Sequence, residues 1–261
     1  MSIIKSLWRY PIKSMLGEKL HAVNITPKGL QGDRAFALLD VETGKIVSAK
    51  NPKKWPHMFS FHSRYEEITD LNTIHITLPD GTTIKNNDPN VDSILSDALG
   101  RKVKIISQVP KQPQLEEYWP DIAEFDNRNT VTDENIPKGA FYDLGVIHLL
   151  TTSTLDELHR LYPEGRFEAS RFRPNIILDT QQAGFVENQW VEKTMTIGDE
   201  VTLKITEHCP RCVMTTLAQD DLPKDPGILK TAVQHNEGNV GIYAEVIKGG
   251  TIKCGDPINI I

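Results

Sequence analysis

The sequence predicts a protein of the α+β class that is mainly β. Short runs rich in β-branched residues recur along the chain, one segment has the full pattern of a β-hairpin, and only three segments show helical periodicity. Strands at regular spacing with scattered helices argue against a doubly wound parallel sheet. No GxGxxG or Walker motif is present, so the sequence gives no support for nucleotide binding.

The predicted strands are short and separated by turn residues. The last part of the chain, residues 241–261, repeats the pattern with Gly249-Gly250 between two runs. The other predicted strands are HAVNIT (21–26), RAFALLD (34–40), KIVSA (45–49), KVKIIS (102–107), PNIILD (174–179) and EVTLKIT (200–206).

The segment TIHITLPDGTTIK, residues 73–85, carries the hairpin pattern. Ile74, Ile76 and Leu78 alternate on one side of its first arm, and residues 79–81, Pro-Asp-Gly, have the chemistry of a tight turn. We therefore expect a β-hairpin here, whose chain returns through Thr83.

Three helices are predicted. Residues 91–99 place their apolar side chains on one stripe, with a glycine directly after them. In LLTTSTLDELHRLYP, Thr154 and Glu157 have the spacing of a capping box, and Pro163 ends the helix. GILKTAVQHN, residues 227–236, is the third.

The composition argues against a nucleic-acid-binding protein, a membrane-spanning protein and a disulfide-rich secreted protein. The chain has 261 residues, a formal net charge of −6 and three cysteines, Cys209, Cys212 and Cys254. An acidic balance argues against a nucleic-acid surface, and no apolar run is long enough for a membrane span. Without an N-terminal apolar stretch and without a disulfide framework, we expect a cytoplasmic protein. Three thiols are too few for an internal Cys₄ iron–sulfur cluster.

A polar, proline-containing stretch at residues 109–129 is the best candidate for a domain boundary. We expect an N-terminal domain over residues 1–118 and a C-terminal domain over residues 119–261.

The sequence Cys209-Pro210-Arg211-Cys212 allows four interpretations. It can be half of a zinc site completed by Cys254 and a histidine, or a redox dithiol, which would need a helix after it. It can also provide one thiolate to a soft metal other than zinc, while Arg211 holds an anionic or polar cofactor. Finally, both cysteines can be small buried apolar residues.

Together with four other motifs, this one forms a series of five in a fixed order. YPIKS, GLQGDRAFALLD and SRFRPNIILD precede CPRCVMTT, with Trp190 and IGD (197–199) between them, and GTIKCGDPI follows. This series resembles the MOSC-domain proteins that carry an N-terminal β-barrel extension, over about residues 7–260. The resemblance implies a β-barrel MOSC domain interlocked with a β-rich N-terminal domain, and the molybdenum cofactor, a pyranopterin dithiolene with a terminal phosphate, as ligand.

The resemblance also implies which residues bind this cofactor. Cys212 is the implied metal ligand and catalytic residue. Asp33 fits better as the orienting partner of an arginine than as a ligand, and the proline after Arg173 predicts an extended backbone there. The implied cofactor-binding residues are Lys13, Ser14, Arg34, Asp143, Arg173, Asn175, Arg211 and Tyr243.

The implied function is a molybdenum-dependent reductase of N-hydroxylated small molecules. Its electrons would come from an external donor, such as a flavin reductase working through a ferredoxin, a flavodoxin or a b5-type haem protein. The alternative is a non-catalytic carrier or sulfur-transfer protein for molybdenum cofactor. One departure from the family pattern is Ala218, where an aspartate is common; Asp220 follows two residues later.

Overall fold

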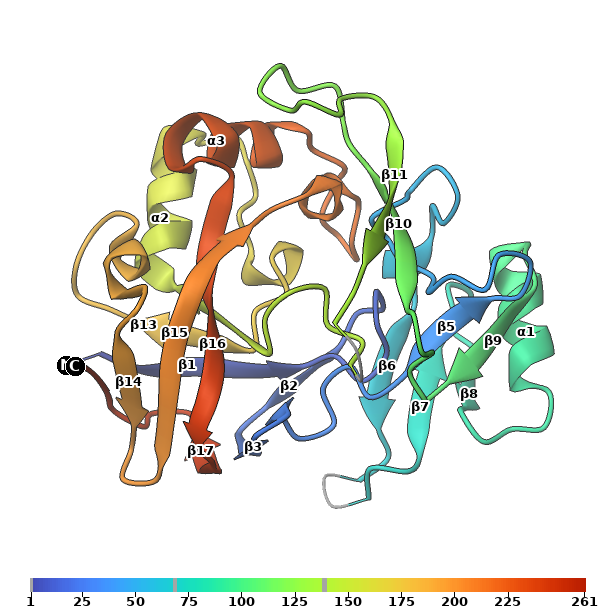
Figure 1. Ribbon diagram of the computed structural model, residues 1–261, viewed down its shortest axis with the longest axis horizontal. Helices are drawn as coiled ribbons and strands as arrows, with labels where there is room; N and C mark the ends of the chain where they lie inside the picture. Colours follow the sequence, from blue (N-terminus) through green and yellow to red (C-terminus); the bar gives the residue numbers. More distant parts are fainter. Residues whose placement is uncertain (1, 68–69, 138–139) are drawn as a thin grey trace. The chain divides into compact units, whose positions relative to one another are not determined.

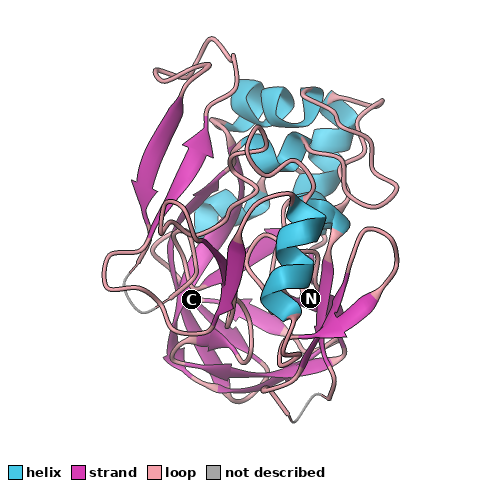
Figure 2. Ribbon diagram, turned by 90° about the vertical axis from the view of Figure 1, so that its right-hand side faces the viewer, coloured by secondary structure: helices cyan, strands magenta, loops and turns pink. Residues whose placement is uncertain are grey.

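The computed structural model describes residues 2–67, 70–137 and 140–261. Contacts divide the chain into two units. Unit 1 comprises Met1–Arg9, Lys19–Gln31 and Gly145–Ile261, and unit 2 comprises Tyr10–Glu18 and Gly32–Leu144. Strands predominate in both units (Figure 2), which confirms the predicted mainly β, α+β class. The predicted sequence boundary between residues 118 and 119 stays a prediction.

Unit 1 is built on an eight-stranded sheet with the order β18-β14-β15-β16-β12-β13-β1-β2 (Figure 1). The pair β12–β13 is parallel, and its neighbouring pairs β1–β13 and β12–β16 are antiparallel. The strands are β1 (Ile3–Arg9), β2 (Glu18–Leu20), β12 (Ile147–Thr151), β13 (Ile176–Asp179), β14 (Thr194–Ile197), β15 (Val201–Pro210), β16 (Asn239–Lys248) and β18 (Ile258–Ile260).

Backbone hydrogen bonds bring the two sides of this sheet back together. Ile4 N donates to Asp256 O at 3.0 Å, Gly255 N donates to Ile4 O at 2.8 Å, and Ile258 N donates to Ser2 O at 3.0 Å. The first strand is thereby joined to the last segment of the chain, as in a barrel, which removes exposed edges. A three-stranded sheet adds β3 (Ala22–Thr26), β4 (Gly29–Leu30) and β17 (Gly250–Lys253).

Two helices of unit 1 pack beside each other, α2 (Thr152–Leu161) and α3 (Gly227–Asn236) (Figure 1). Short 3₁₀ turns η2 (Ala169–Arg171), η3 (Val186–Trp190) and η4 (Val213–Thr216) connect the larger elements. The predicted helix at 227–236 is confirmed. The predicted cap of α2 is wrong in register, because the Thr151 hydroxyl accepts the hydrogen bond from Thr154 N at 3.1 Å.

Unit 2 consists of small sheets and one helix. α1 (Val91–Leu99) ends at a left-handed Gly100 and confirms the first predicted helix. The expected strand at 45–49 is wrong, because Ile46 makes only single bridges to Leu39 and Leu115. β7 (Ile74–Thr77) and β8 (Thr83–Lys85) form the predicted hairpin, and the 3₁₀ turn η1 (Met58–Ser60) precedes β6 (His62–Tyr65). The sheets of unit 2 are β6 with β7 and β8, β5 (Ala37–Asp40) with β9 (Val103–Ile106), and β10 (Gln114–Tyr118) with β11 (Val131–Asn135).

Each unit has its own apolar core. The barrel of unit 1 is filled by a cluster of buried residues that includes Ile4, Leu149, Met195, Leu203 and Ile242. A second cluster lies under α2 and α3, and a third, around Ile46 and Leu115, lies in unit 2. Burying such side chains provides the main stabilisation of each unit.

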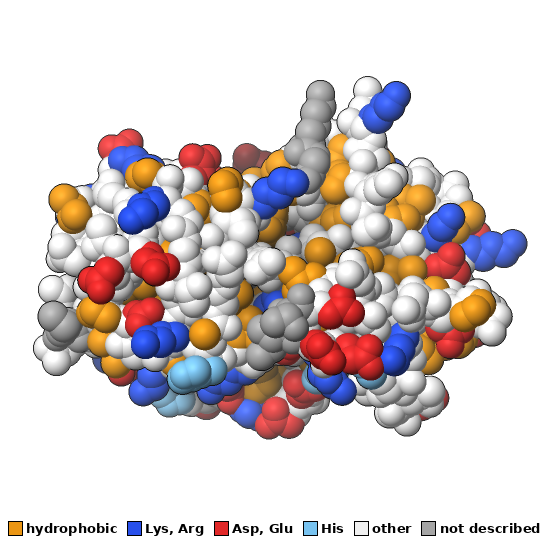
Figure 3. Space-filling view, turned by 90° about the horizontal axis from the view of Figure 1, so that it is seen from below, with side chains coloured by type: hydrophobic (Ala, Val, Ile, Leu, Met, Phe, Trp, Pro, Cys, Tyr) orange, Lys and Arg blue, Asp and Glu red, His pale blue; other side chains and the backbone are white. Residues whose placement is uncertain are grey.

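On the face shown in Figure 3, Lys and Arg side chains lie among Asp and Glu side chains, so neither sign of charge dominates there. In the described part of the chain, no helix has both the length and the apolar character needed to cross a membrane.

The eight-stranded sheet is closely packed at Gly241 in β16. Its φ is +86°, and an added Cβ would lie 2.4 Å from His148 Nε2 and 2.5 Å from Leu149 O. Gly44 has a similar φ of +69° with no atom near the added Cβ. We expect Gly44→Ala to cost about 1–2 kcal/mol for backbone strain alone, and Gly241→Ala to cost about 3 kcal/mol or more. Denaturant unfolding measures both; equal losses would contradict the close approach.

Candidate functional site

In unit 2, the buried Lys13 forms an ion pair with the partly exposed Asp143. Lys13 is 4% exposed, its Nζ contacts Asp143 Oδ1, and it also donates to Phe141 O at 2.8 Å. Burial lowers the pKa of Lys13, and the negative charge of Asp143, which raises that pKa, offsets the effect only in part. Burial would raise the pKa of Asp143, but the ammonium groups of Lys13 and Lys50 outweigh it and hold that pKa below its usual range.

Arg34 is the second predicted cation of unit 2. Its Nη1 contacts Asp33 Oδ2, and Asp33 Oδ1 accepts from Tyr10 N at 2.7 Å, which confirms Asp33 as an orienting partner. The guanidinium lies 5.0 Å from the centroid of the Tyr10 ring. Burial opposes its charge, but Asp33 raises the pKa of Arg34, so it remains a fixed cation.

Sequence reasoning missed Lys50 and Tyr142. Lys50 Nζ lies 2.9 Å from Glu117 Oε2 and 3.8 Å from Asp143 Oδ2, and it completes, with Lys13 and Arg34, what we call the unit 2 cation cluster. Burial and Asp33 raise the pKa of the Tyr142 phenol. The lysines at positions 50, 53 and 54 are a sequence signal for a basic segment. The ion-pair partner of Lys50, Glu117, is 67 residues away, so the sequence does not reveal the pair.

Left-handed backbone marks three of the predicted cofactor residues. Ser14, Arg34 and Arg173 have φ of 63°, 47° and 55°. Such values are uncommon for residues other than glycine and concentrate at functional sites. The expectation that Arg173 is extended is therefore wrong: its N–H donates to Ala169 O at 3.1 Å, which closes a turn after η2.

Ser14 is buried, and its Oγ accepts from Ala49 N at 3.1 Å. A serine hydroxyl that accepts this bond still has its own proton to donate. Ser14 can therefore offer one donor to a ligand while it fixes the segment that leads to Lys50.

In unit 1, Cys212 lies at the end of β15. The bridge between Pro210 and Asn239 and the bond from Arg211 N to Gly238 O at 2.8 Å tie this end to β16. Cys212 is partly exposed, while Cys209 is fully buried. Of the CxxC pair, Cys212 is thus the one that a ligand can reach.

Arg211 lies among the two sulfurs and an aromatic ring. Its Nη1 donates to Cys209 Sγ at 2.7 Å, and its Nη2 donates to Phe172 O at 2.9 Å. Burial opposes its charge, but Cys209, Tyr243 and Cys212 raise the pKa of Arg211. Its Nε is buried without a hydrogen-bond partner among the described residues. A buried donor of this kind calls for an acceptor from water or a ligand.

Tyr243 lies in β16 with its ring centroid 5.6 Å from that of His148. An added Cβ on Gly145 would come within 2.3 Å of Tyr243 Cγ, so glycine is required beside this ring. Sequence reasoning missed His148, which is buried in β12 and whose Nε2 lies 3.1 Å from Val240 O.

Asn175 connects three strands. Its Oδ1 accepts from His148 N at 3.1 Å, and its Nδ2 donates to Trp8 O at 3.4 Å. The amide therefore holds β1, β12 and β13 together; its contact with a cofactor stays a prediction.

The zinc and redox-dithiol interpretations of the CxxC motif lack structural support, whereas Cys209 is a small buried residue, as the fourth interpretation expected. Among the described residues, no group of three or more His, Cys, Asp or Glu side chains could hold a metal ion, as a zinc site would need. The segment after Cys212 is a single 3₁₀ turn, η4, in place of the α-helix that follows a redox dithiol in thioredoxin-like proteins.

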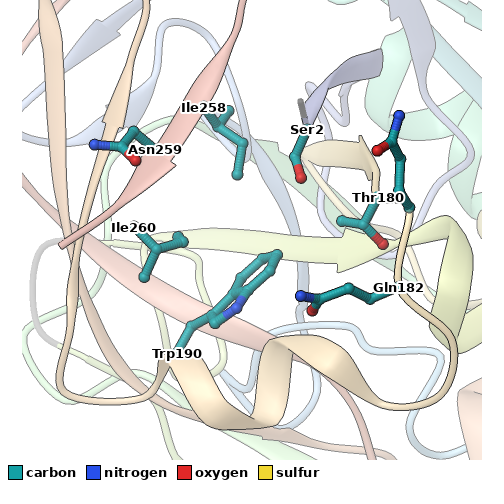
Figure 4. A pocket seen from close by; sticks show the side chains of 8 residues that line it. Ser2, Thr180, Gln182, Trp190, Ile258, Asn259 and Ile260 are labelled. Atoms are coloured by element: carbon teal, nitrogen blue, oxygen red, sulfur yellow. The ribbon is translucent and has the colours of Figure 1, made fainter.

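The residues fit the molybdenum cofactor that the resemblance implies. In unit 1, Cys212 offers a partly exposed sulfur, and Arg211, the residue before it, has an Nε donor without a partner among the described residues. Taken by itself, the unit 2 cation cluster has the charge that a phosphate requires. A separate groove of about 390 Å³, lined by Ser2, Thr180, Trp190 and neighbouring residues, contains none of the predicted site residues (Figure 4).

This fold and site define a class: a β-rich protein in which a partly exposed cysteine, Cys212, follows a β-strand end and an arginine, Arg211, that is bonded to sulfur and backbone. The MOSC domain profile matches residues 138–259, and the MOSC N-terminal beta barrel domain profile matches residues 1–103. The chain belongs to the MOSC-domain proteins with an N-terminal β-barrel domain, which confirms the resemblance.

Relatives span nearly the whole chain at low identity. The mitochondrial amidoxime reducing component 2 of Bos taurus is 26% identical over 98% of this chain and 82% of that protein. The human mitochondrial amidoxime-reducing component 1 is 24% identical over 99% and 82%. A molybdenum cofactor sulfurase of Oryza sativa subsp. japonica is 22% identical over 94% of this chain but 33% of that protein.

A solved structure supports the fold. The YUAD protein from Bacillus subtilis superposes with a TM-score of 0.51 and 11% identity, over 100% of this chain and 96% of that one. At this identity the likeness concerns the fold alone.

The Lys13–Asp143 pair gives a prediction of stability. Asp143→Asn leaves the Lys13 ammonium buried without its carboxylate, and we expect the free energy of unfolding at pH 7 to fall by about 2–4 kcal/mol. Glu157→Gln breaks the exposed pair with Arg160 and should cost about 0.5 kcal/mol or less. Denaturant unfolding measures both.

The pH dependence of this difference follows from the lowered pKa of Asp143. A carboxylate whose pKa is lower in the folded state stabilises the fold above its unfolded pKa of about 3.9 and loses that effect as pH falls further. The gap between wild type and Asp143→Asn should therefore shrink below about pH 4. A gap that is constant down to pH 2 would contradict the assignment.

Proposed function

We propose that this protein is a molybdenum-cofactor-dependent reductase of N-hydroxylated small molecules. The observation that carries the proposal is the partly exposed Cys212 thiol next to Arg211, whose buried Nε atom lacks a partner among the described residues. The names of the amidoxime reducing relatives support the reaction class.

The proposal assigns each residue a role. Cys212 ligates the metal through its sulfur, and Arg211 donates hydrogen bonds from the buried side of the turn. Arg173, Asn175 and Tyr243 contact the cofactor from unit 1. Lys13, Ser14, Arg34 and Asp143, in unit 2, bind its phosphate and polar edges.

When bound, the cofactor supplies two-electron oxygen-atom chemistry at its metal. An amidoxime, two electrons and two protons give an amidine and water. The chain's own part is to fix the sulfur of Cys212 and to offset the negative charge of the cofactor with Lys13, Arg34 and Arg211. We propose that electrons come from an external donor protein, a ferredoxin, a flavodoxin or a b5-type haem protein served by a flavin reductase.

The test is replacement of the proposed ligand. Cys212→Ser should lose at least about 100-fold in reduction of benzamidoxime with a chemical electron donor, because it removes a metal ligand, and should lower bound molybdenum. Cys254→Ser is the matched control, since its Sγ lies 3.6 Å from Leu20 O and has no proposed role. Bound molybdenum and amidine formation are measured on the same samples.

Full amidoxime reduction by Cys212→Ser would overturn the role of this sulfur. The second candidate function, favoured by the sulfurase relative's name, is a non-catalytic carrier or sulfur-transfer protein for molybdenum cofactor. It would be supported if the wild type binds molybdenum and transfers it to an apo-enzyme but does not reduce amidoximes.

A further inference from the structure

The motif SRFRPN contains two arginines, and the proposed function uses only Arg173. Arg171, the last residue of η2, is fully buried at 0% exposure. Buried arginines are rare unless they are paired, so its surroundings call for a physical account.

The Arg171 guanidinium bonds only to backbone carbonyls in the hydrogen bonds that the structure shows. Nε donates to Arg166 O at 2.7 Å, and Nη2 donates to Pro223 O at 2.8 Å. Nη1 is shared between Leu217 O at 3.1 Å and Thr215 O at 3.3 Å. Three of these four carbonyls belong to residues 215–223, a stretch that begins inside η4 and continues beyond it.

Such an arrangement is costly for the folded state. A charge taken out of water without a carboxylate in contact is destabilising, and burial lowers the pKa of Arg171. Asp225 and Glu168 offset the charge from a distance. Arginine is nevertheless the side chain whose planar fork of five donors can serve several carbonyls at once.

One of these carbonyls belongs to Thr215, which is itself hydrogen-bonded to Cys212. Thr215 N donates to Cys212 O at 3.2 Å, and Thr215 Oγ1 donates to the same oxygen at 3.1 Å. Arg171 holds Thr215 from its other side, through its carbonyl. On the opposite flank of Cys212, Arg211 Nη2 is bonded to Phe172 O, the residue next to Arg171.

We propose that Arg171 is the positioning residue of the Cys212 turn, residues 212–216: its buried guanidinium clamps the carbonyls of Thr215, Leu217 and Pro223 and so fixes the direction of the Cys212 sulfur. The role of that sulfur rests on the proposed function, but the clamp itself concerns the chain alone. A metal ligand that is held in advance loses less freedom when it binds.

The experiment compares Arg171→Met, which keeps volume but removes every donor, with Arg171→Lys, which keeps the charge and some donors. In the full chain without cofactor, iodoacetamide labelling of Cys212 is followed by peptide mass spectrometry, which separates it from Cys209 and Cys254. Amide hydrogen exchange is measured over residues 212–217. Molybdenum retention is measured on cofactor-loaded protein.

Two control variants separate positioning from general loss of stability. Arg160→Gln removes an exposed arginine of α2, and Leu203→Ala destabilises the barrel core of unit 1 without touching the Cys212 turn.

We expect Arg171→Met to change the Cys212 labelling rate at least threefold and to speed exchange at Thr215 at least tenfold, with partial rescue in Arg171→Lys. Neither control should do so under native conditions. Labelling and exchange equal to wild type in Arg171→Met, or equal changes in Leu203→Ala, would overturn the proposal. Because labelling and exchange need no cofactor, they stand even if the wild type binds no molybdenum and the proposed function fails.

Discussion

The pairing of β15 with β16 is the constraint on which the unit 1 site depends. The two strands run antiparallel from Thr202–Lys248 to Pro210–Asn239, with irregularities in register after Thr202, Ile205 and His208. Register in a sheet is set by which side chains must be buried, and a shift of one residue would turn every side chain to the other face. Beyond the last irregularity, the Pro210–Asn239 bridge and the bond from Arg211 N to Gly238 O fix where the chain leaves the sheet before Cys212.

The second constraint is electrostatic. Four cations lose water on folding, and each has a different kind of partner. Lys13 contacts the carboxylate of Asp143, and Arg34 contacts that of its neighbour Asp33. Arg171 is bonded to backbone carbonyls, and Arg211 to a sulfur and a carbonyl. A chain that needed only stability would bury apolar groups of the same volume. The left-handed backbone at Ser14, Arg34 and Arg173 adds local strain. Buried charge and local strain of this kind concentrate at functional sites, and they support the proposed binding roles of these residues.

Local signals were reliable wherever one short segment contained the whole pattern. The hairpin at 73–85 and the helices at 91–99 and 227–236 were predicted well, because alternation, turn residues and flanking glycine are local. The cap of α2 was placed three residues late, since two threonines compete and the tertiary fold selects Thr151. KIVSA has strand-like residues but pairs only at Ile46. Arg173 precedes a proline, yet hydrogen bonds to η2 override the usual preference for an extended backbone.

By itself, the sequence determined the β-rich class, the family and the set of chemically active residue types, because these depend on composition, periodicity and ordered motifs. Only the tertiary structure decided how those residues are used. It buried Cys209 and left Cys212 accessible, paired Lys13 with Asp143 across 130 positions, and engaged both ends of the Asn175 amide with backbone groups. It also revealed Lys50, His148 and Arg171, because burial and long-range hydrogen bonds depend on distances in space that no local spacing encodes.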